Sequence, residues 1–336
     1  MEGLLTVGSL NEQEVENDGM SQDSASSQEL LNGHILAPPL ERVPGDGAGR
    51  RLIWQGLLIV GIMAAIAFCE YVFAYKNVAY GIIISLVLVV ILYTLLTVSP
   101  LSDELASCIE SITLVPMYIL FTSSLPWFFV HQYFLLPAVY SCVLALCWVH
   151  IYQKQLDLKQ IFGAIPGGRQ IAWLIPAGAL IGVSLGFVEY VILRPAPTYG
   201  HVTAMEIVVN LLYMLFFVGL GEELLFRGFI QSDLSRLFGW RWGLVLASVL
   251  FSIMHLTWRS VPELFFVLLA GLIFGSLYLK TRGLYLSILA HCMNNVVLVA
   301  VYPYLVGASF SVRIQALIWQ WLTSINTSTF IYLFRR

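Results

Sequence analysis

Apolar runs of about 20 residues follow one another from residue 50 onward, and they limit what this chain can fold into. A helix of about 20 residues is long enough to cross the hydrocarbon core of a bilayer. Only 11% of the residues are charged, whereas a soluble domain usually has about 25%. We expect helices near 52–75, 78–99, 105–123, 133–151, 171–193, 207–230, 241–258, 262–279, 284–303 and 314–334. The sequence therefore predicts an all-α fold, a polytopic transmembrane helical bundle of about ten spans.

The run 105–123 fits this pattern less well than the others. It contains Glu110 and Pro116, so a re-entrant or interfacial segment is the alternative to a full crossing. The distribution of basic residues separates the two possibilities, because losing one crossing would invert every later loop.

Basic residues favour ten crossings with both termini in the cytoplasm. Twelve then lie at the cytoplasmic ends and loops: Arg42, Arg50, Arg51, Lys154, Lys159, Arg169, Arg236, Arg241, Lys280, Arg282, Arg335 and Arg336. Only Lys76, Arg194, Arg259 and Arg313 lie outside. Since cytoplasmic loops carry the excess of Lys and Arg, we predict this orientation. The membrane would be the cell membrane in a prokaryote and the endoplasmic reticulum in a eukaryote.

The chain divides into three parts by composition. Residues 1–49 hold nine of the twenty acidic residues and few apolar ones, which predicts a disordered acidic cytoplasmic tail. Residues 50–170 are expected to form accessory transmembrane helices, and residues 171–336 a second set in the C-terminal half, for which the motifs described below imply a catalytic core. Two amphipathic segments, 152–169 and 228–239, are expected as surface helices in the membrane interface.

One polar cluster interrupts the sixth run, at residues 221–228 with the sequence Gly-Glu-Glu-Leu-Leu-Phe-Arg-Gly. Charged groups inside a membrane are costly and usually functional, although a juxtamembrane ion pair is the simpler alternative. On a helix, Glu223 and Arg227 stand four residues apart in the favourable order for an ion pair. Glu222 points about 100° away. We therefore predict that Arg227 neutralises Glu223 and leaves Glu222 free to react.

Polar residues in two later runs are candidates to join Glu222. Phe251 and His255 lie one helical turn apart in the seventh run, and His291 and Asn295 lie one turn apart in the ninth. Each residue alone could be a hydrogen-bonded packing residue. Around one cavity, however, a carboxylate, two imidazoles and a carboxamide can hold a water, take its proton and stabilise an oxyanion.

A zinc ion is an alternative way to activate that water. Two histidines and one carboxylate form a recognised catalytic zinc set, and Glu222, His255 and His291 would supply it. The HExxH spacing of common zinc peptidases is absent from the sequence. The residues leave both a zinc-dependent mechanism and a metal-free glutamate mechanism open.

These motifs resemble those of the CPBP family of intramembrane proteases, also called the Abi family or type II CAAX prenyl endopeptidases. The family motifs EExxxR, FxxxH and HxxxN correspond to Glu222-Glu223 to Arg227, Phe251 to His255, and His291 to Asn295, within residues 205–300. The resemblance implies that Glu222 is the base that activates water. It also implies that His255, His291 and Asn295 position that water or the oxyanion, with Glu223, Arg227 and Phe251 in support.

The same resemblance implies a function and its partners. Eukaryotic members remove the last three residues of prenylated CaaX proteins, whereas prokaryotic members are linked to bacteriocin self-immunity or to membrane-protein processing. We therefore expect a hydrolase that acts on a prenylated protein or a membrane peptide at the cytoplasmic face of a lipid bilayer. No nucleic-acid partner is expected.

Two other functions are compatible with intramembrane acids. A proton-coupled transporter would use such groups as a relay, and Glu70, Glu110, Glu189 and Glu206 would be candidates for it. The simpler interpretation of these four is helix-end or interfacial residues with local partners. Transporters commonly show two related halves, and no such repeat is visible here. A non-catalytic membrane scaffold is the second alternative.

Overall fold

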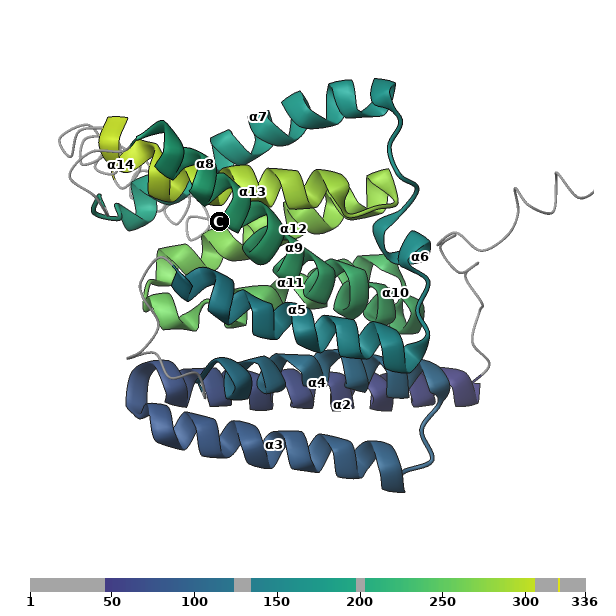
Figure 1. The fold of residues 1–336 in the computed structure, drawn as a ribbon. Coiled ribbons are helices and arrows are strands. Elements are labelled where there is room, and N and C mark those ends of the chain that lie inside the picture. Colours follow the sequence, from purple (N-terminus) through teal and green to yellow (C-terminus); the bar gives the residue numbers. More distant parts are fainter. Residues whose placement is uncertain (1–45, 124–133, 198–202, 306–319, 321–336) are drawn as a thin grey trace, which may run out of the picture. The chain divides into compact units, whose positions relative to one another are not determined.

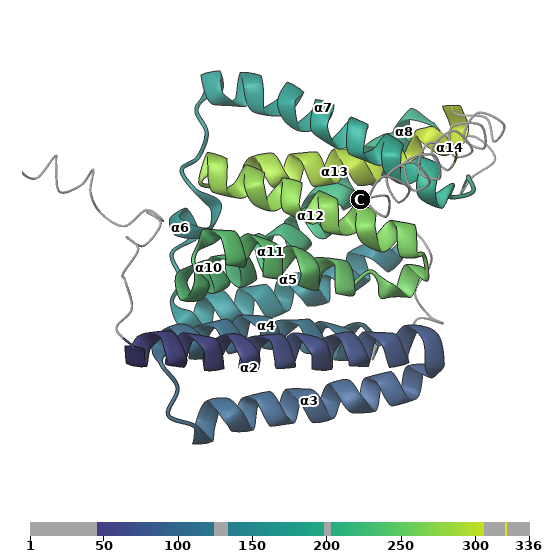
Figure 2. The same ribbon diagram turned by 180° about the vertical axis from the view of Figure 1, so that it is seen from behind.

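All regular structure in the computed structural model is helical, over the residues that it describes (Figures 1 and 2). These residues are 46–123, 134–197, 203–305 and 320. The predicted all-α fold is therefore confirmed. The tail 1–45 lies outside the described residues, as does the tenth predicted span apart from one helical residue at 320.

The first part of the described chain consists of five helices and one π-helical turn. These are α2 (Asp46–Tyr71), η1 (Val72–Lys76), α3 (Val78–Val98), α4 (Asp103–Ser123), α5 (Leu135–Lys154) and α6 (Leu158–Phe162). Because α2 begins at Asp46, the predicted tail boundary at residue 49 falls inside this helix. The start of α3 is fixed by Asn77, whose side chain accepts a hydrogen bond from the Tyr80 backbone N–H at 3.2 Å.

The second part begins with α7 (Gly168–Leu193) and continues with a composite helix, which changes winding several times without interruption. Its segments are α8 (Ala204–Tyr213), η4 (Met214–Gly219), α9 (Leu220–Glu223), η5 (Leu224–Gln231) and α10 (Ser232–Phe238), of which η4 and η5 are π-helical. It is followed by α11 (Trp240–Ile253), the 3₁₀ turn η6 (Leu256–Trp258), α12 (Val261–Thr281), α13 (Tyr285–Ala300) and α14 (Tyr302–Leu305).

Nine helical stretches among the described residues are long and apolar enough to cross a membrane. They correspond to the first nine predicted spans, which confirms the polytopic bundle. The stretch Asp103–Ser123 is one of them, and it runs without interruption through Pro116. Many apolar side chains on α3 are exposed, such as Ile83, Val87 and Val90, as expected for a helix that faces lipid.

Packing between helices positions the segments that carry the candidate site residues. Helix α13 packs between α7 and α12, and α11 packs between α12 and α10 (Figure 1). Helix α4 contacts α10 on one side and α2, α3 and α5 on others (Figure 2). Ile59 and Ile66 of α2 are completely buried in the same apolar cluster as Ile109 and Ile112 of α4. The accessory helices therefore share one core with the C-terminal half.

The prediction of a surface helix at 228–239 was wrong. Residues 228–235 are all buried, and they belong to η5 and α10 inside the bundle. Burial is possible because the polar side chains have partners. Asp233 accepts a hydrogen bond from the Ser111 hydroxyl at 2.7 Å and forms an ion pair with Arg236 at 2.7 Å.

The other predicted surface helix, 152–169, is also absent as a single helix. Helix α5 continues to Lys154, a turn follows, and only the five residues of α6 are helical before α7 begins. Ile161 of α6 is buried, and its Cγ2 lies 3.1 Å from the position that a Cβ would take at Gly228. This segment is thus anchored to η5 by an apolar contact.

Candidate active site

Glu223 and Arg227 form the buried ionic centre of the site. Their side chains are 0% and 1% exposed, and Arg227 Nη1 donates to Glu223 Oε1 at 2.7 Å, which confirms the predicted ion pair. The guanidinium lies 4.5 Å from the centre of the Phe251 ring and 5.5 Å from that of Phe274. It also donates to the Gly271 carbonyl oxygen at 3.2 Å. An arginine can be buried here because its charge and its donors are matched.

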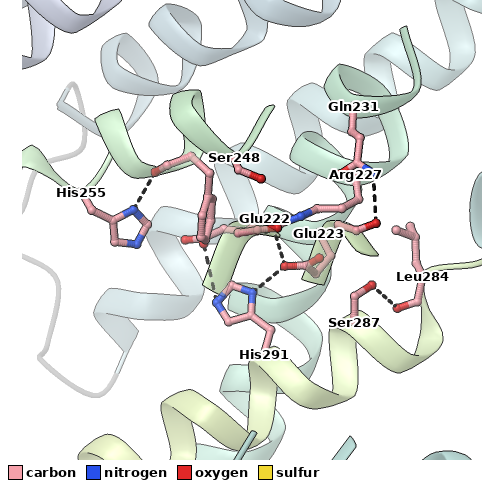
Figure 3. A network of polar contacts seen from close by, with 12 residues as sticks. Glu222, Glu223, Arg227, Gln231, Ser248, His255, Leu284, Ser287 and His291 are labelled. Atoms are coloured by element: carbon pink, nitrogen blue, oxygen red, sulfur yellow. Dashed lines mark hydrogen bonds and ion pairs between the residues drawn. The ribbon is translucent and has the colours of Figure 1, made fainter. Parts of the chain in front are cut away.

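His291 connects the two glutamates. Its Nδ1 lies 2.8 Å from Glu223 Oε1, and its Nε2 lies 3.7 Å from Glu222 Oε2 (Figure 3). Since a carboxylate accepts, Nδ1 carries the proton in this contact, and Nε2 is directed at Glu222. The Phe274 ring stacks on the imidazole at 5.0 Å with an interplanar angle of 17°. The histidine is therefore fixed in position and orientation.

The two carboxylate oxygens of Glu222 differ in their hydrogen bonds. The Tyr140 hydroxyl of α5 donates a hydrogen bond to Oε1. Oε2 has no hydrogen-bond partner among the described residues, although it is buried and faces His291. A gap of 3.7 Å between two polar atoms is the distance at which a bridging water should be considered. A water beside this gap could contact both Oε2 and Nε2.

His255 approaches Glu222 from another direction. It follows the last turn of α11, and its Nδ1 lies 2.9 Å from the Phe251 carbonyl oxygen, to which it can donate. The Phe251 ring packs against the His255 ring at 4.8 Å and against the His291 ring at 6.0 Å. Phe251 therefore packs against both imidazoles.

A pocket of about 130 Å³ gives access to Glu222. Its walls are formed by Tyr118, Tyr140, Val143, Glu222, Leu225, Phe226, Met254, His255, Thr257 and Trp258. Most of these side chains are apolar or aromatic, so the pocket suits a partly apolar group next to two polar ones. Glu222 and His255 share this pocket, whereas His291 is not among the residues that line it.

Asn295 lies one turn beyond His291 on α13, as predicted, but its side-chain contact is local. Its Oδ1 accepts a hydrogen bond from Asn294 Nδ2 at 3.2 Å, and Asn294 also donates to Glu189 of α7. Asn295 is not part of the pocket wall around Glu222.

The predicted zinc set does not fit the arrangement. Among the described residues, no three His, Cys, Asp or Glu side chains are close enough to hold a metal ion. Glu222, His255 and His291 have the right donor chemistry, and the Phe251 ring packs against both imidazoles. The zinc hypothesis stays a prediction.

Several residues of the site were missed by sequence reasoning. Tyr140 and Tyr118 come from α5 and α4, far from Glu222 in the sequence, and neither has a motif that marks it. Phe274 of α12 resembles any other apolar residue of its span. Of these missed residues, Asn294 is the one that the sequence could have indicated, since it is a polar residue beside Asn295 in an apolar run.

The four acids considered for a proton relay fall into two groups. Glu110 forms an ion pair with Lys154, and Glu206 caps the start of α8 with Thr203, so both have the local partners expected of helix-end residues. Glu70 and Glu189 are buried instead. These positions are spread over separate helices.

Comparisons with known proteins agree with this site. The fold and site together are a polytopic helical bundle with a glutamate pair, an arginine and histidines inside it. Residues 204–297 match the family model described as Type II CAAX prenyl endopeptidase Rce1-like, and this match is consistent with the resemblance to the CPBP family.

The chain is also similar to an "Uncharacterized 24.3 kDa protein" of Escherichia coli. The two are 24% identical over 153 residues, which cover 44% of this chain and 70% of that protein. No solved structure matches the chain.

Proposed function

We propose that this protein is an intramembrane endopeptidase that hydrolyses a peptide bond near the cytoplasmic face of the membrane. The observation that carries the proposal is the open oxygen of Glu222, buried without a partner and facing His291 Nε2 at 3.7 Å. A buried carboxylate oxygen next to an imidazole is an arrangement that can hold a water and accept its proton.

The proposed reaction uses a metal-free glutamate mechanism. Glu222 Oε2 takes one proton from the water while the water oxygen bonds to the carbonyl carbon of the peptide. The tetrahedral oxyanion is stabilised by N–H donors. The candidates are the Asn295 amide and a doubly protonated His255, whose Nε2–H can donate while Nδ1–H stays on the Phe251 carbonyl oxygen. The carbon–nitrogen bond then breaks, and Glu222 returns its proton to the leaving amine.

Glu223 and Arg227 have a supporting role in this proposal. Arg227 pairs with Glu223, and Glu223 in turn accepts the hydrogen bond from Nδ1 of His291. His291 then presents Nε2 to the water. This division gives the two adjacent glutamates different roles, in agreement with the asymmetry expected from their spacing.

The proposed substrate is a prenylated CaaX-type protein or a membrane peptide. This step rests on the family match, whose description names a CAAX prenyl endopeptidase. The apolar pocket wall is compatible with either substrate. Cytoplasmic termini, and a cell or endoplasmic reticulum membrane, belong to the same proposal.

Cleavage of a farnesylated CaaX peptide by membranes that contain the protein tests the proposal. We expect Glu222→Gln to lower the rate by at least about 100-fold, because the general base is lost. Glu104→Gln is the matched control, since Glu104 is exposed at the start of α4. The wild type should keep its activity in a chelator. Loss of activity in the chelator, restored by zinc, would favour the zinc mechanism instead.

Equal cleavage by wild type and Glu222→Gln would overturn the assigned role of Glu222. No cleavage by any form would argue against the prenylated substrate, and membrane peptides and transport would then be tested.

A further inference from the structure

Helix α5 brings a tyrosine to the candidate base from outside the family match. Tyr140 lies in the accessory part of the chain, 64 residues before the matched segment 204–297 begins. Its hydroxyl donates to Glu222 Oε1, a contact between residues 82 positions apart in the sequence. The matched segment therefore does not contain everything that contacts Glu222.

This contact distinguishes the two oxygens of Glu222. The terminal torsion of a glutamate is broad and nearly two-fold, so an untethered carboxylate can exchange its oxygens or tilt out of plane. Here Oε1 is bound by Tyr140, and Oε2 is left open toward His291. A tyrosine hydroxyl is well suited to this task, because it donates one hydrogen bond and does not titrate near neutral pH.

The Tyr140 ring lies beside the backbone next to Glu222. The position that a Cβ would take at Gly221 lies 3.4 Å from Tyr140 Cδ1 and 3.6 Å from Val143 Cγ1. A methyl group added at Gly221 would therefore be in van der Waals contact with the ring. Tyr118 of α4, which is also one of the accessory helices, lines the same pocket.

We infer that Tyr140 is a positioning residue that orients the Glu222 carboxylate, and that the accessory helices thereby complete the active site. The inference rests on the proposed function. It assigns a catalytic contribution to a part of the chain for which neither the motifs nor the family match provide one.

The test compares Tyr140→Phe with wild type, Glu222→Gln and the control Tyr152→Phe in the farnesylated CaaX peptide assay. Tyr152 is on the same helix and is 72% exposed. We expect Tyr140→Phe to lower kcat by about 10- to 100-fold, because a misoriented base loses this much. KM should stay within about threefold, and the thermal midpoint of the purified protein should fall by only a few degrees. Tyr152→Phe should match wild type.

A second measurement does not depend on activity. Thermal midpoints of Tyr140→Phe, Glu222→Gln and the double variant form a double-mutant cycle. Because the two groups contact each other directly, the two shifts should not add, and the deviation should exceed about 2 °C.

The outcomes separate this inference from the proposed function. Loss of kcat in Tyr140→Phe at unchanged KM, together with non-additive midpoints, supports the inference. A wild-type kcat in Tyr140→Phe, while Glu222→Gln is inactive, overturns the inference and leaves the proposed function intact. If no form cleaves the peptide, the proposed substrate fails, and the cycle decides: additive midpoints overturn the inference, whereas coupled midpoints support the contact that it requires.

Discussion

At the residue scale, the site depends on one buried arginine. Arg227 is matched by the Glu223 carboxylate, by a backbone carbonyl and by two aromatic rings. Removing one partner of a buried ion pair leaves the other charge without compensation, and this costs more than the pair itself contributes. The stability of the protein and the orientation of His291 should therefore depend on the same residue.

Arg227→Met should destabilise the protein by about 3–5 kcal/mol, since it leaves Glu223 charged in an apolar interior. Unfolding of the purified protein in detergent, followed by its thermal midpoint, measures the effect. The double variant with Glu223→Gln should recover part of the loss. Arg241→Met is the control, because Arg241 is exposed at the start of α11. A loss no larger than that of the control would contradict the assigned role of Arg227.

At the element scale, three glycines bring α7 close to α13. Gly178, Gly182 and Gly186 recur every four residues on α7, so they lie on one face. A Cβ at Gly182 would lie against the Ala290 carbonyl oxygen and 2.6 Å from Met293 Cβ. Small residues at this spacing allow helix backbones to approach closely in membranes. Helix α13, which carries His291, is thus positioned by α7.

Gly182→Ala should lower stability by about 1–3 kcal/mol, because the added methyl group forces the two backbones apart. It should also lower the rate of peptide cleavage, since α13 would move relative to Glu222. Gly61→Ala is the matched control, because a Cβ at this helical position of α2 has nothing within 4 Å. Its thermal midpoint should be unchanged or slightly higher. Equal midpoints for the two variants would exclude a close-packing role for Gly182.

At the scale of the whole molecule, the accessory and C-terminal helices form one structure around the site. The pocket wall combines Tyr118, Tyr140 and Val143 from α4 and α5 with side chains from α9, from η5 and from the segment that follows α11. Polar groups of η5 also bind α12, where Gln231 donates to the Gly275 carbonyl oxygen at 3.1 Å. The division into accessory and catalytic parts therefore does not describe the pocket.

A disulfide cross-link measures this arrangement directly. Val143 Cβ lies 3.8 Å from the position of a Cβ at Gly221, a separation typical of disulfides. Oxidation of the variant Val143→Cys with Gly221→Cys should therefore join the two peptides, as detected by mass spectrometry after proteolysis.

Two control variants make the cross-link specific. Val149→Cys with Gly221→Cys should not link, because Val149 is exposed on α5. Gly221→Cys alone shows whether the native Cys142 reacts. Absence of the 143–221 link, with both thiols accessible to oxidant, would contradict the packing of α5 against α9.

The sequence by itself determined the features that depend on local spacing and on the cost of polar groups in a membrane. Apolar runs of spanning length predicted the all-α bundle and nine helices that the structure describes. The four-residue spacing of Glu223 and Arg227 predicted their ion pair, because these residues are neighbours on any helix. The family motifs directed attention to His291, which does contact both glutamates.

Only the tertiary structure decided which side chains from distant segments meet. Tyr140 reaches Glu222 across 82 residues, and no periodicity within either helix encodes that contact. Residues 228–239 were placed at the surface because their pattern is amphipathic. Residues 228–235 of this stretch are buried instead, and Ser111, from another helix, supplies a partner for the buried Asp233. Long-range pairing of this kind depends on how whole helices pack, so it is set by the complete bundle and not by any one stretch of sequence.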